Sequence, residues 1–580
     1  MKMKKILSSF AIGALAAGLF APGFGDFAAG MDLSRAEAAI IDHGDTFHYG
    51  NTEAMKAYMQ SIYGENQRIT GSYDKSLAVK CVNGTFVGER NGEILSFKGI
   101  PFVAEQPVGK NRFKRPVPFA PDDGVYEARY FGKACAQAYE GTEPSVLYKT
   151  GEDCLYLNIW KNTEDKTEKK PVMVWIHGGA YQFGGTMDPA YDGHNFLTDN
   201  PDVILVTVAY RVGALGFCHL SHLPGGEQYP DAQNNGILDQ IMALKWVHEN
   251  IAAFGGDPDN VTIFGQSAGG GSVSTLSVIP EARQYFQRVI AQSGSNAFLR
   301  KPEMAMEFTR RMFEKAGVDT LDEFLALPLE KVIDASTVLF LRTVPERDGK
   351  LIPYRPFDYM ASGAMKDIDF MEGTTHDEAN YYCFSMGANK ELFTNVFSTA
   401  YGQFFASIEP EEALKAREFM KMTPGDEFDK LSTFCTQTQY TAPVLRQSEE
   451  LAKGGGKVFH YQSFLAAAPP GMGAMHSQEV SVVFNNLDYQ TVSCRDVDRT
   501  FARTMQRMWV NFAKKGNPSL TAEESPTGKA IKWEPYNTKT KPIMSINEFD
   551  IHMSNAKELK ITDWERVYPL TKYYFVMPAD

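Results

Sequence analysis

The chain carries the stretch Asp257-Pro-Asp-Asn-Val-Thr-Ile-Phe-Gly-Gln-Ser-Ala-Gly-Gly-Gly271, in which a short apolar run stops just before Ser267. Gly265 and Gly269 flank this serine and lack the side chains that would collide in a tight turn. The preceding residues are the β-branched and aromatic types found in buried strands, namely Val261, Ile263 and Phe264. The stretch therefore predicts a strand, a sharp turn and a helix, with the Ser267 hydroxyl at the end of the strand.

This motif is a weak signal by itself, because glycine is abundant in the chain and Gly-x-Ser-x-Gly also arises by chance. A glycine-rich turn with a solvated serine explains the motif alone equally well. Residues elsewhere in the chain have to decide between the two interpretations.

The composition of the chain is typical of a globular protein. With 580 residues, 43% hydrophobic and 22% charged, the chain is globular and long enough for a large core. The 71 acidic residues exceed the 58 basic ones, and no Lys/Arg cluster marks a helix face. We therefore expect no nucleic-acid partner.

The first 38 residues resemble a secretory signal. Three lysines precede the apolar stretch 6–20, which is too short to span a bilayer comfortably, and Ala36-Glu37-Ala38 is a small-x-small cleavage site. We expect residues 1–38 to direct export, to the periplasm or out of the cell, and the mature chain to carry no membrane span. An uncleaved N-terminal anchor is the alternative.

The rest of the chain predicts one domain over residues 76–580, preceded by a polar segment, 39–75, to which the sequence assigns no role. The seven cysteines are too few for a disulfide scaffold, although export would allow suitably placed pairs to oxidise. Cys135 and Cys154 are the two cysteines closest to each other along the sequence, and the other five show no spacing typical of metal ligands.

Successive segments predict a mostly parallel sheet. Residues 77–87 and 94–97 have hairpin patterns, which we expect to form antiparallel edge strands. Buried strands are predicted within 152–160, 171–177 and 203–209, and the best helix covers 237–254. Because the strand before Ser267 follows that helix, the order predicts a right-handed crossover, with ligands collecting at the carboxyl ends of the strands.

Glycines follow the strand 171–177 directly. Gly178 and Gly179 leave backbone N–H groups unobstructed, as an oxyanion requires, although an ordinary loop is the alternative. For His177, which lies in the turn itself, we favour a structural role.

Two further candidate strands, 367–373 and 456–464, are each followed by polar residues. Glu378 follows the first and His476 the second, and a helix then carries Phe501, Met505, Met508 and Phe512 before Gly516. Ser267, Glu378 and His476 thus each come after a strand, in the order nucleophile, acid, histidine that α/β-hydrolases use. A serine hydroxyl needs such a base, held in the right tautomer by a third group. No internal repeat is found, so one sheet with insertions explains the chain better than two domains.

The sequence resembles the type-B carboxylesterase and lipase family, which includes the cholinesterases, from about Ser76 to the C-terminus. Five motifs carry the resemblance: Glu152-Asp-Cys-Leu-Tyr-Leu-Asn158, Trp175-Ile-His-Gly-Gly179, Tyr210-Arg-Val-Gly-Ala-Leu-Gly-Phe217, the stretch from Phe254 to Gly270, and Gly373-Thr-Thr-His-Asp-Glu378. It implies an α/β-hydrolase fold, a large mostly parallel sheet flanked by helices with helical insertions.

Site residues follow from the resemblance. It implies Ser267 as nucleophile, His476 as general base and acid, and Glu378, rather than Asp377, as the residue that orients His476. The oxyanion hole would use the N–H groups of Gly179, Ala180 and Ala268. Two positions depart from the family pattern: Ala180 replaces a glycine in the hole, and Ala379 replaces the glycine after Glu378.

The implied activity is hydrolysis of carboxylic esters through an acyl-enzyme on Ser267, with no metal and no organic cofactor. A true lipase acting on acylglycerols is one alternative, and a non-catalytic cholinesterase-like binding protein is another. The resemblance also implies a disulfide between Cys135 and Cys154. The loop it would close, residues 136–153, is short and charged and has no tryptophan, which favours water-soluble small-molecule esters over an oil surface. The oligomeric state is not predicted.

Overall fold

The computed structural model describes residues 58, 60–137, 148–337, 343–407, 409–466, 471–487, 497–548 and 550–561. The predicted signal, residues 1–38, and the middle of the loop 136–153 lie outside these ranges. Within them, no helix is both long and apolar enough to cross a lipid bilayer.

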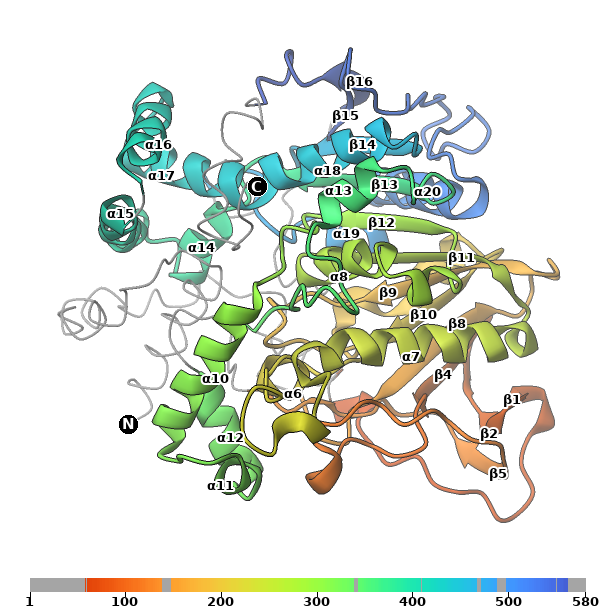
Figure 1. Cartoon of the computed structure of the whole chain (residues 1–580). Helices are drawn as coiled ribbons and strands as arrows, with labels where there is room; N and C mark the ends of the chain where they lie inside the picture. Colours follow the sequence, from red (N-terminus) through yellow and green to blue (C-terminus); the bar gives the residue numbers. More distant parts are fainter. Residues whose placement is uncertain are drawn as a thin grey trace.

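One eleven-stranded sheet organises the described chain, in the order β16-β15-β14-β13-β12-β11-β9-β10-β8-β4-β3 (Figure 1). The strands from β10 to β15 along this order are parallel, whereas β3, β4, β8 and β16 pair antiparallel with their neighbours. The strands are β3 (Glu89–Asn91), β4 (Ile94–Pro101), β8 (Tyr156–Asn162), β9 (Lys170–Ile176), β10 (Ile204–Val208), β11 (Gly256–Gln266), β12 (Arg288–Gln292), β13 (Asp369–Thr375), β14 (Val458–Ser463), β15 (Pro542–Asn547) and β16 (Asp550–Asn555).

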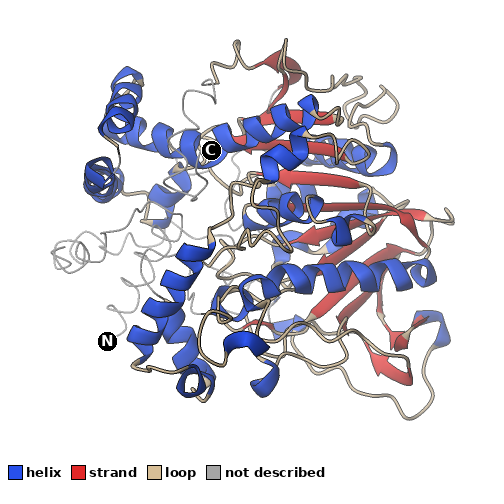
Figure 2. Ribbon diagram, viewed as in Figure 1, coloured by secondary structure: helices blue, strands red, loops and turns tan. Residues whose placement is uncertain are grey.

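Helices cover both faces of this sheet (Figure 2). They are α5 (Gly193–Asp199), α6 (Gly213–Gly216), α7 (Asn235–Asn250), α8 (Ala268–Ser277), α9 (Pro280–Arg283), α10 (Pro302–Ala316), α11 (Leu321–Leu325), α12 (Leu329–Ser336), α13 (Pro356–Ala361), α14 (Asn380–Ser385), α15 (Lys390–Ser407), α16 (Pro410–Met422), α17 (Glu427–Thr436), α18 (Ala442–Lys453), α19 (Val480–Phe484) and α20 (Arg499–Lys515). A π-helical turn, η8 (Gln437–Thr441), joins α17 to α18.

The core forms two layers because side chains alternate across each strand. In β9, Val172, Val174 and Ile176 pack into the cluster that contains the apolar face of α7. Met173 and Trp175 point the other way and pack with α20. The strand is buried on both faces, as its continuous apolar sequence predicted.

The hairpin prediction for residues 77–87 is correct, but its place in the fold was wrong. β1 (Ala78–Cys81) and β2 (Asn83–Val87) pair antiparallel and join β5 (Asp122–Glu127) in a separate three-stranded sheet rather than at the edge of the main one. The chain turns at Gly88, where a Cβ would lie 2.4 Å from the Ser96 carbonyl oxygen. A short two-stranded sheet of β6 (Ala134–Cys135) and β7 (Thr150–Gly151) completes the strands.

Part of the polar segment 39–75 is also described, and it packs on the body of the domain. The Asn66 side chain donates to the Lys98 and Tyr130 carbonyl oxygens, at 2.9 Å each, and accepts from the Arg129 and Tyr130 N–H groups. Ile62 is buried in the layer on the α20 side of the sheet. This stretch therefore contributes to the core.

Candidate active site

Ser267 lies at the junction between β11 and α8. Its backbone adopts φ 57° and ψ −122°, a left-handed conformation that is strained for any residue other than glycine. The Ser267 N–H donates to the Gln292 carbonyl oxygen at 2.8 Å, and its carbonyl oxygen accepts from the Gly271 N–H at 2.8 Å. Both neighbours thus hold the strained turn in place, with the serine side chain half-buried.

The flanking glycines are required by the closeness of β9. A Cβ on Gly269 would lie 2.0 Å from the Ile176 carbonyl oxygen, and one on Gly265 would lie 2.6 Å from the same atom. These distances are far below van der Waals contact. The turn has the geometry of a nucleophile elbow, as the sequence predicted.

Glu378 and His476 are brought together from two different strand ends. The His476 Nδ1–H donates to Glu378 Oε2 at 2.5 Å, and both side chains are buried. The pairing fixes the neutral imidazole in the tautomer that leaves Nε2 as an acceptor. A base oriented in this way can take a proton from a hydroxyl.

Asp377, the alternative acid, faces elsewhere. Its carboxylate contacts the His376 ring at 2.9 Å and accepts from the Ala474 N–H at 2.9 Å. It therefore positions the loop that carries His476 without touching the His476 ring.

Two further donors hold the other oxygen of Glu378. Oε1 accepts from the Ser293 hydroxyl at 2.6 Å and from the Thr375 N–H at 2.8 Å. Ser293 follows β12 with φ 51° and was missed by the sequence analysis, which did not identify β12. The sequence does contain a signal for Ser293, because a serine directly follows the short apolar run that forms β12.

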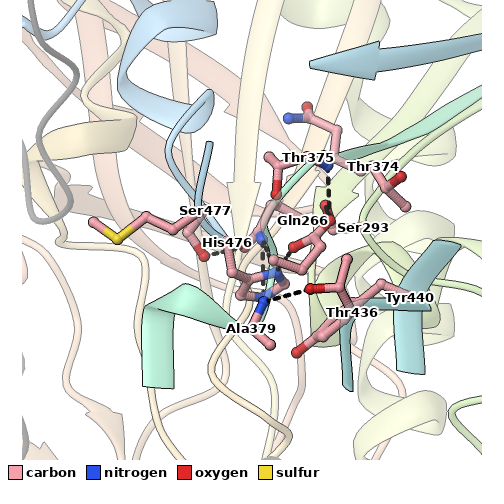
Figure 3. A network of polar contacts seen from close by, with 12 residues as sticks. Gln266, Ser293, Thr374, Thr375, Ala379, Thr436, Tyr440, His476 and Ser477 are labelled. Atoms are coloured by element: carbon pink, nitrogen blue, oxygen red, sulfur yellow. Dashed lines mark hydrogen bonds and ion pairs between the residues drawn. The ribbon is translucent and has the colours of Figure 1, made fainter. Parts of the chain in front are cut away.

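Figure 3 shows Gln266 and Ser477 beside the His476 ring. The Gln266 amide lies 3.1 Å from His476 Nε2, and its oxygen accepts from the Ser477 hydroxyl at 3.0 Å. The Ser267 hydroxyl itself makes no hydrogen bond to any residue that the structure describes. The amide nitrogen of Gln266 therefore donates to His476 Nε2, the ring atom that would otherwise be free to accept a proton from the serine.

The predicted oxyanion donors surround the same turn. A Cβ on Gly178 would lie 3.3 Å from the Ser267 Cβ, so the turn after β9 runs alongside the serine. Gly179 and Ala180 have φ values of 107° and 54°, and Ala268 is the first residue of α8. Across the described residues, the N–H groups of Gly179, Ala180 and Ala268 donate to no other protein atom. They are available to a ligand oxygen.

His177 has a different role from His476. Its ring stacks on Tyr210 with 4.4 Å between ring centroids, and Nδ1–H donates to the Gly178 carbonyl oxygen at 2.8 Å. Burial lowers the pKa of His177 to about 4, so the ring is neutral at pH 7. The contacts favour the structural role that we expected for it.

The helical insertion adds side chains that no sequence pattern indicated. The Tyr440 ring in the π-helical turn lies 4.7 Å from the His476 ring, and the Thr436 hydroxyl accepts from the Ala379 N–H at 3.0 Å (Figure 3). Inserted π-turns often occur at functional sites. The segment from α17 to η8 therefore contacts both the His476 ring and the residue that follows Glu378.

A second buried acid, Glu479, lies three residues after His476, directly before α19. Burial, followed by repulsion from the nearby Glu378, raises the pKa of Glu479 to about 7. Its carboxylate accepts from the Gln292 side chain at 3.2 Å.

The predicted disulfide is absent from the structure. Cys135 and Cys154 are both buried free thiols, and the hydrogen bond between their side chains, followed by burial, raises the pKa of Cys154 well above its usual value. The two sulfurs are thus adjacent without a covalent bond. No cluster of metal-ligating side chains occurs within the described ranges.

A mostly parallel sheet with a nucleophile elbow after β11, and with an acid and a histidine after β13 and β14, is typical of an α/β-hydrolase. Solved structures share this fold. A carboxylesterase of Geobacillus stearothermophilus superposes with a TM-score of 0.72 at 33% identity, over 85% of this chain and 100% of that one.

Residues 75–562 match the model of the carboxylesterase family, so the chain belongs to that family and is a carboxylic ester hydrolase. A para-nitrobenzyl esterase of Bacillus subtilis is 32% identical over 495 residues, covering 82% of this chain and 95% of that protein. An acetylcholinesterase of Bungarus fasciatus is 29% identical over 521 residues, covering 82% and 83%.

Proposed function

We propose that this chain is an exported serine esterase that hydrolyses water-soluble carboxylic esters through an acyl-enzyme on Ser267. The observation that carries the proposal is the 2.5 Å hydrogen bond from His476 to the buried Glu378, next to a strained serine turn lined with unused N–H groups. These are the three parts that acyl transfer requires: a base, a nucleophile and an oxyanion site.

The reaction follows from this geometry. When an ester binds, the Gln266 amide leaves His476 Nε2, which accepts the Ser267 proton as Oγ attacks the ester carbonyl. The N–H groups of Gly179, Ala180 and Ala268 stabilise the oxyanion, and His476 protonates the departing alcohol. Water then enters, and the same groups release the acid. Glu378, hydrogen-bonded to His476, stabilises the imidazolium in both steps.

The choice of soluble esters rests on the segment around 136–153. Its described ends are anchored. Gln137 exchanges hydrogen bonds with Gly184 at 2.9 and 3.0 Å, and the hydroxyl of the half-buried Tyr148 donates to Asp188 at 3.0 Å. Near the other end, Glu152 is paired with Arg112. Ends held by partly buried polar contacts resist the large opening of an interfacial lid, because those contacts would be lost.

Ser267→Ala is the direct test, with para-nitrophenyl butyrate as substrate. Activity should fall to the roughly 10³- to 10⁴-fold acceleration over water that remains without a triad nucleophile. A folded variant with activity near that of the parent would refute the assignment. For substrate class, the rate is followed as tributyrin passes its solubility limit, and a jump at that point would favour the true lipase.

Export is a separate part of the proposal, supported by the apolar stretch 6–20, which three lysines precede, and by the cleavage site at Ala36-Glu37-Ala38. The mature protein should begin after Ala38, which N-terminal sequencing of the expressed protein determines. A mature chain that retains residues 1–38 would favour the uncleaved anchor. In the oxidising compartment, we also propose that the adjacent thiols of Cys135 and Cys154 join.

A further inference from the structure

A second serine, histidine and carboxylate are connected in series outside the site described above. The Ser221 hydroxyl lies 3.2 Å from His219 Nε2, and His219 Nδ1 lies 2.6 Å from Glu346 Oε2. Ser221 and His219 belong to the loop after α6, and Glu346 belongs to the segment between α12 and α13. None of them lies on the strand ends that carry Ser267, Glu378 and His476.

The direction of these hydrogen bonds follows from the carboxylate. Glu346 can only accept when ionised, so His219 donates from Nδ1 and keeps a lone pair on Nε2. The Ser221 hydroxyl then donates to that lone pair. This is the arrangement by which a histidine activates a serine nucleophile.

The three groups are held rigidly. The Glu346 side chain is 1% exposed, and its backbone exchanges two hydrogen bonds with the Asn234 side chain, at 2.8 and 2.9 Å. The buried Arg300 is close enough to interact electrostatically with Glu346. On the other side, the Thr309 hydroxyl of α10 donates to the His219 carbonyl oxygen at 2.9 Å.

Access is graded along the series. Glu346 is buried, the His219 side chain is 12% exposed and Ser221 is half-buried, so the oxygen at the outer end is the one that a small molecule reaches. The hydroxyl oxygen of Ser221, which His219 would activate, is therefore the most accessible atom of the three groups.

We propose that Ser221, His219 and Glu346 form a second nucleophilic site, at which Ser221 is acylated by small aryl esters. Ser221 Oγ would attack the ester carbonyl while His219 Nε2 takes its proton. The new Oγ–C bond replaces the C–O bond to the phenolate, which leaves, and His219 then passes its proton to water. The product is an O-acylated Ser221.

The test uses Ser267→Ala, which removes the nucleophile of the first site, with para-nitrophenyl acetate as the probe. Acetylation of each serine is followed by peptide mapping. Ser362 is the matched control, because its hydroxyl is on the surface and donates only to the Tyr359 carbonyl oxygen, at 2.7 Å. General-base assistance should make Ser221 react roughly 10²-fold faster than Ser362.

Replacing His219 with Asn or Glu346 with Gln, each in the Ser267→Ala chain, should reduce Ser221 acetylation to the Ser362 level. The same replacements in the parent chain report folding, because Ser267 should there retain its ester turnover. Equal labelling of Ser221 and Ser362 would overturn the proposal. So would fast labelling that persists in folded His219→Asn. If Glu346→Gln fails to fold, the His219→Asn result decides.

Discussion

Replacement of Glu378 with Gln removes a charge while keeping the shape of the side chain. The two donors on Oε1, the Ser293 hydroxyl and the Thr375 N–H, require an oxygen at that position. The new NH₂ group must therefore face His476 Nδ1, which becomes the acceptor, and the ring proton moves to Nε2. His476 then presents a donor where it should accept the proton of Ser267.

The expected loss follows from this wrong tautomer and from the missing charge beside the imidazolium. An equivalent change in a serine protease lowers kcat by about 10⁴-fold, which corresponds to about 5 kcal/mol of transition-state free energy. We expect a decrease of that order, with the stability little changed, because the hydrogen bonds of residue 378 keep their partners. Only the contact of the Gln266 amide with His476 Nε2 is lost.

The assay is steady-state hydrolysis of para-nitrophenyl butyrate, with thermal unfolding as a check on the fold. Asp377→Asn is the matched control, since Asp377 contacts His376 and the Ala474 N–H but not His476. It should keep kcat within about tenfold of the parent value, because only loop positioning changes. If Asp377→Asn abolished turnover and Glu378→Gln did not, the assignment of the acid would be wrong.

Three further predictions concern the fold around the site. Gly269→Ala should prevent the elbow from forming, because its Cβ would lie 2.0 Å from the Ile176 carbonyl oxygen. Both ester turnover and cooperative unfolding should then be lost. The control is Gly402→Ala on α15, where no atom lies within 4 Å of the added Cβ, and it should leave both properties intact. Glu479→Gln should stabilise the chain increasingly as pH rises. The folded-state pKa of Glu479, about 7, exceeds the unfolded value near 4.5. Burial of the carboxyl group therefore costs no stability below about pH 4 and costs up to about 3 kcal/mol above pH 7. Urea denaturation at several pH values measures this, and a pH-independent difference would contradict it. Oxidation of the exported chain should join Cys135 to Cys154 and stabilise it by about 3 kcal/mol on the chain-entropy model; peptide mapping without reduction that finds two free thiols would exclude the bond.

Long, periodic segments were predicted well because burial determines their pattern. The strands near 171–177 and 203–209 appear as β9 and β10, and the helix predicted over 237–254 appears as α7 followed by a 3₁₀ turn that ends at Gly255. The strand expected from residue 152 begins only at Tyr156, and Glu152 instead forms an ion pair with Arg112 outside the sheet.

Sequence patterns did not predict the short strand β12 or the elements whose shape depends on tertiary packing. β12 has only five residues and begins with an arginine, so its pattern does not differ from that of a loop, although it carries Ser293 to Glu378. The helical insertion that places Tyr440 against His476 includes a π-turn, which depends on tertiary contacts rather than on any sequence period. Likewise, the contact of Gln266 with His476 joins residues 210 positions apart. Local patterns contain no information of that kind.

The two serine sites show what hydrogen-bond order alone does and does not determine. Both connect a serine or its neighbour to a histidine and a buried glutamate, and the Ser221 series is the more complete of the two in the described structure. The Ser267 site adds a strained elbow that holds the nucleophile beside the unused N–H groups of Gly179 and Ala180. Because stabilisation of the oxyanion is usually the largest single contribution to acyl transfer, turnover should belong to Ser267. An activated hydroxyl without that preorganised surrounding should react once with a good electrophile, which is the behaviour proposed for Ser221.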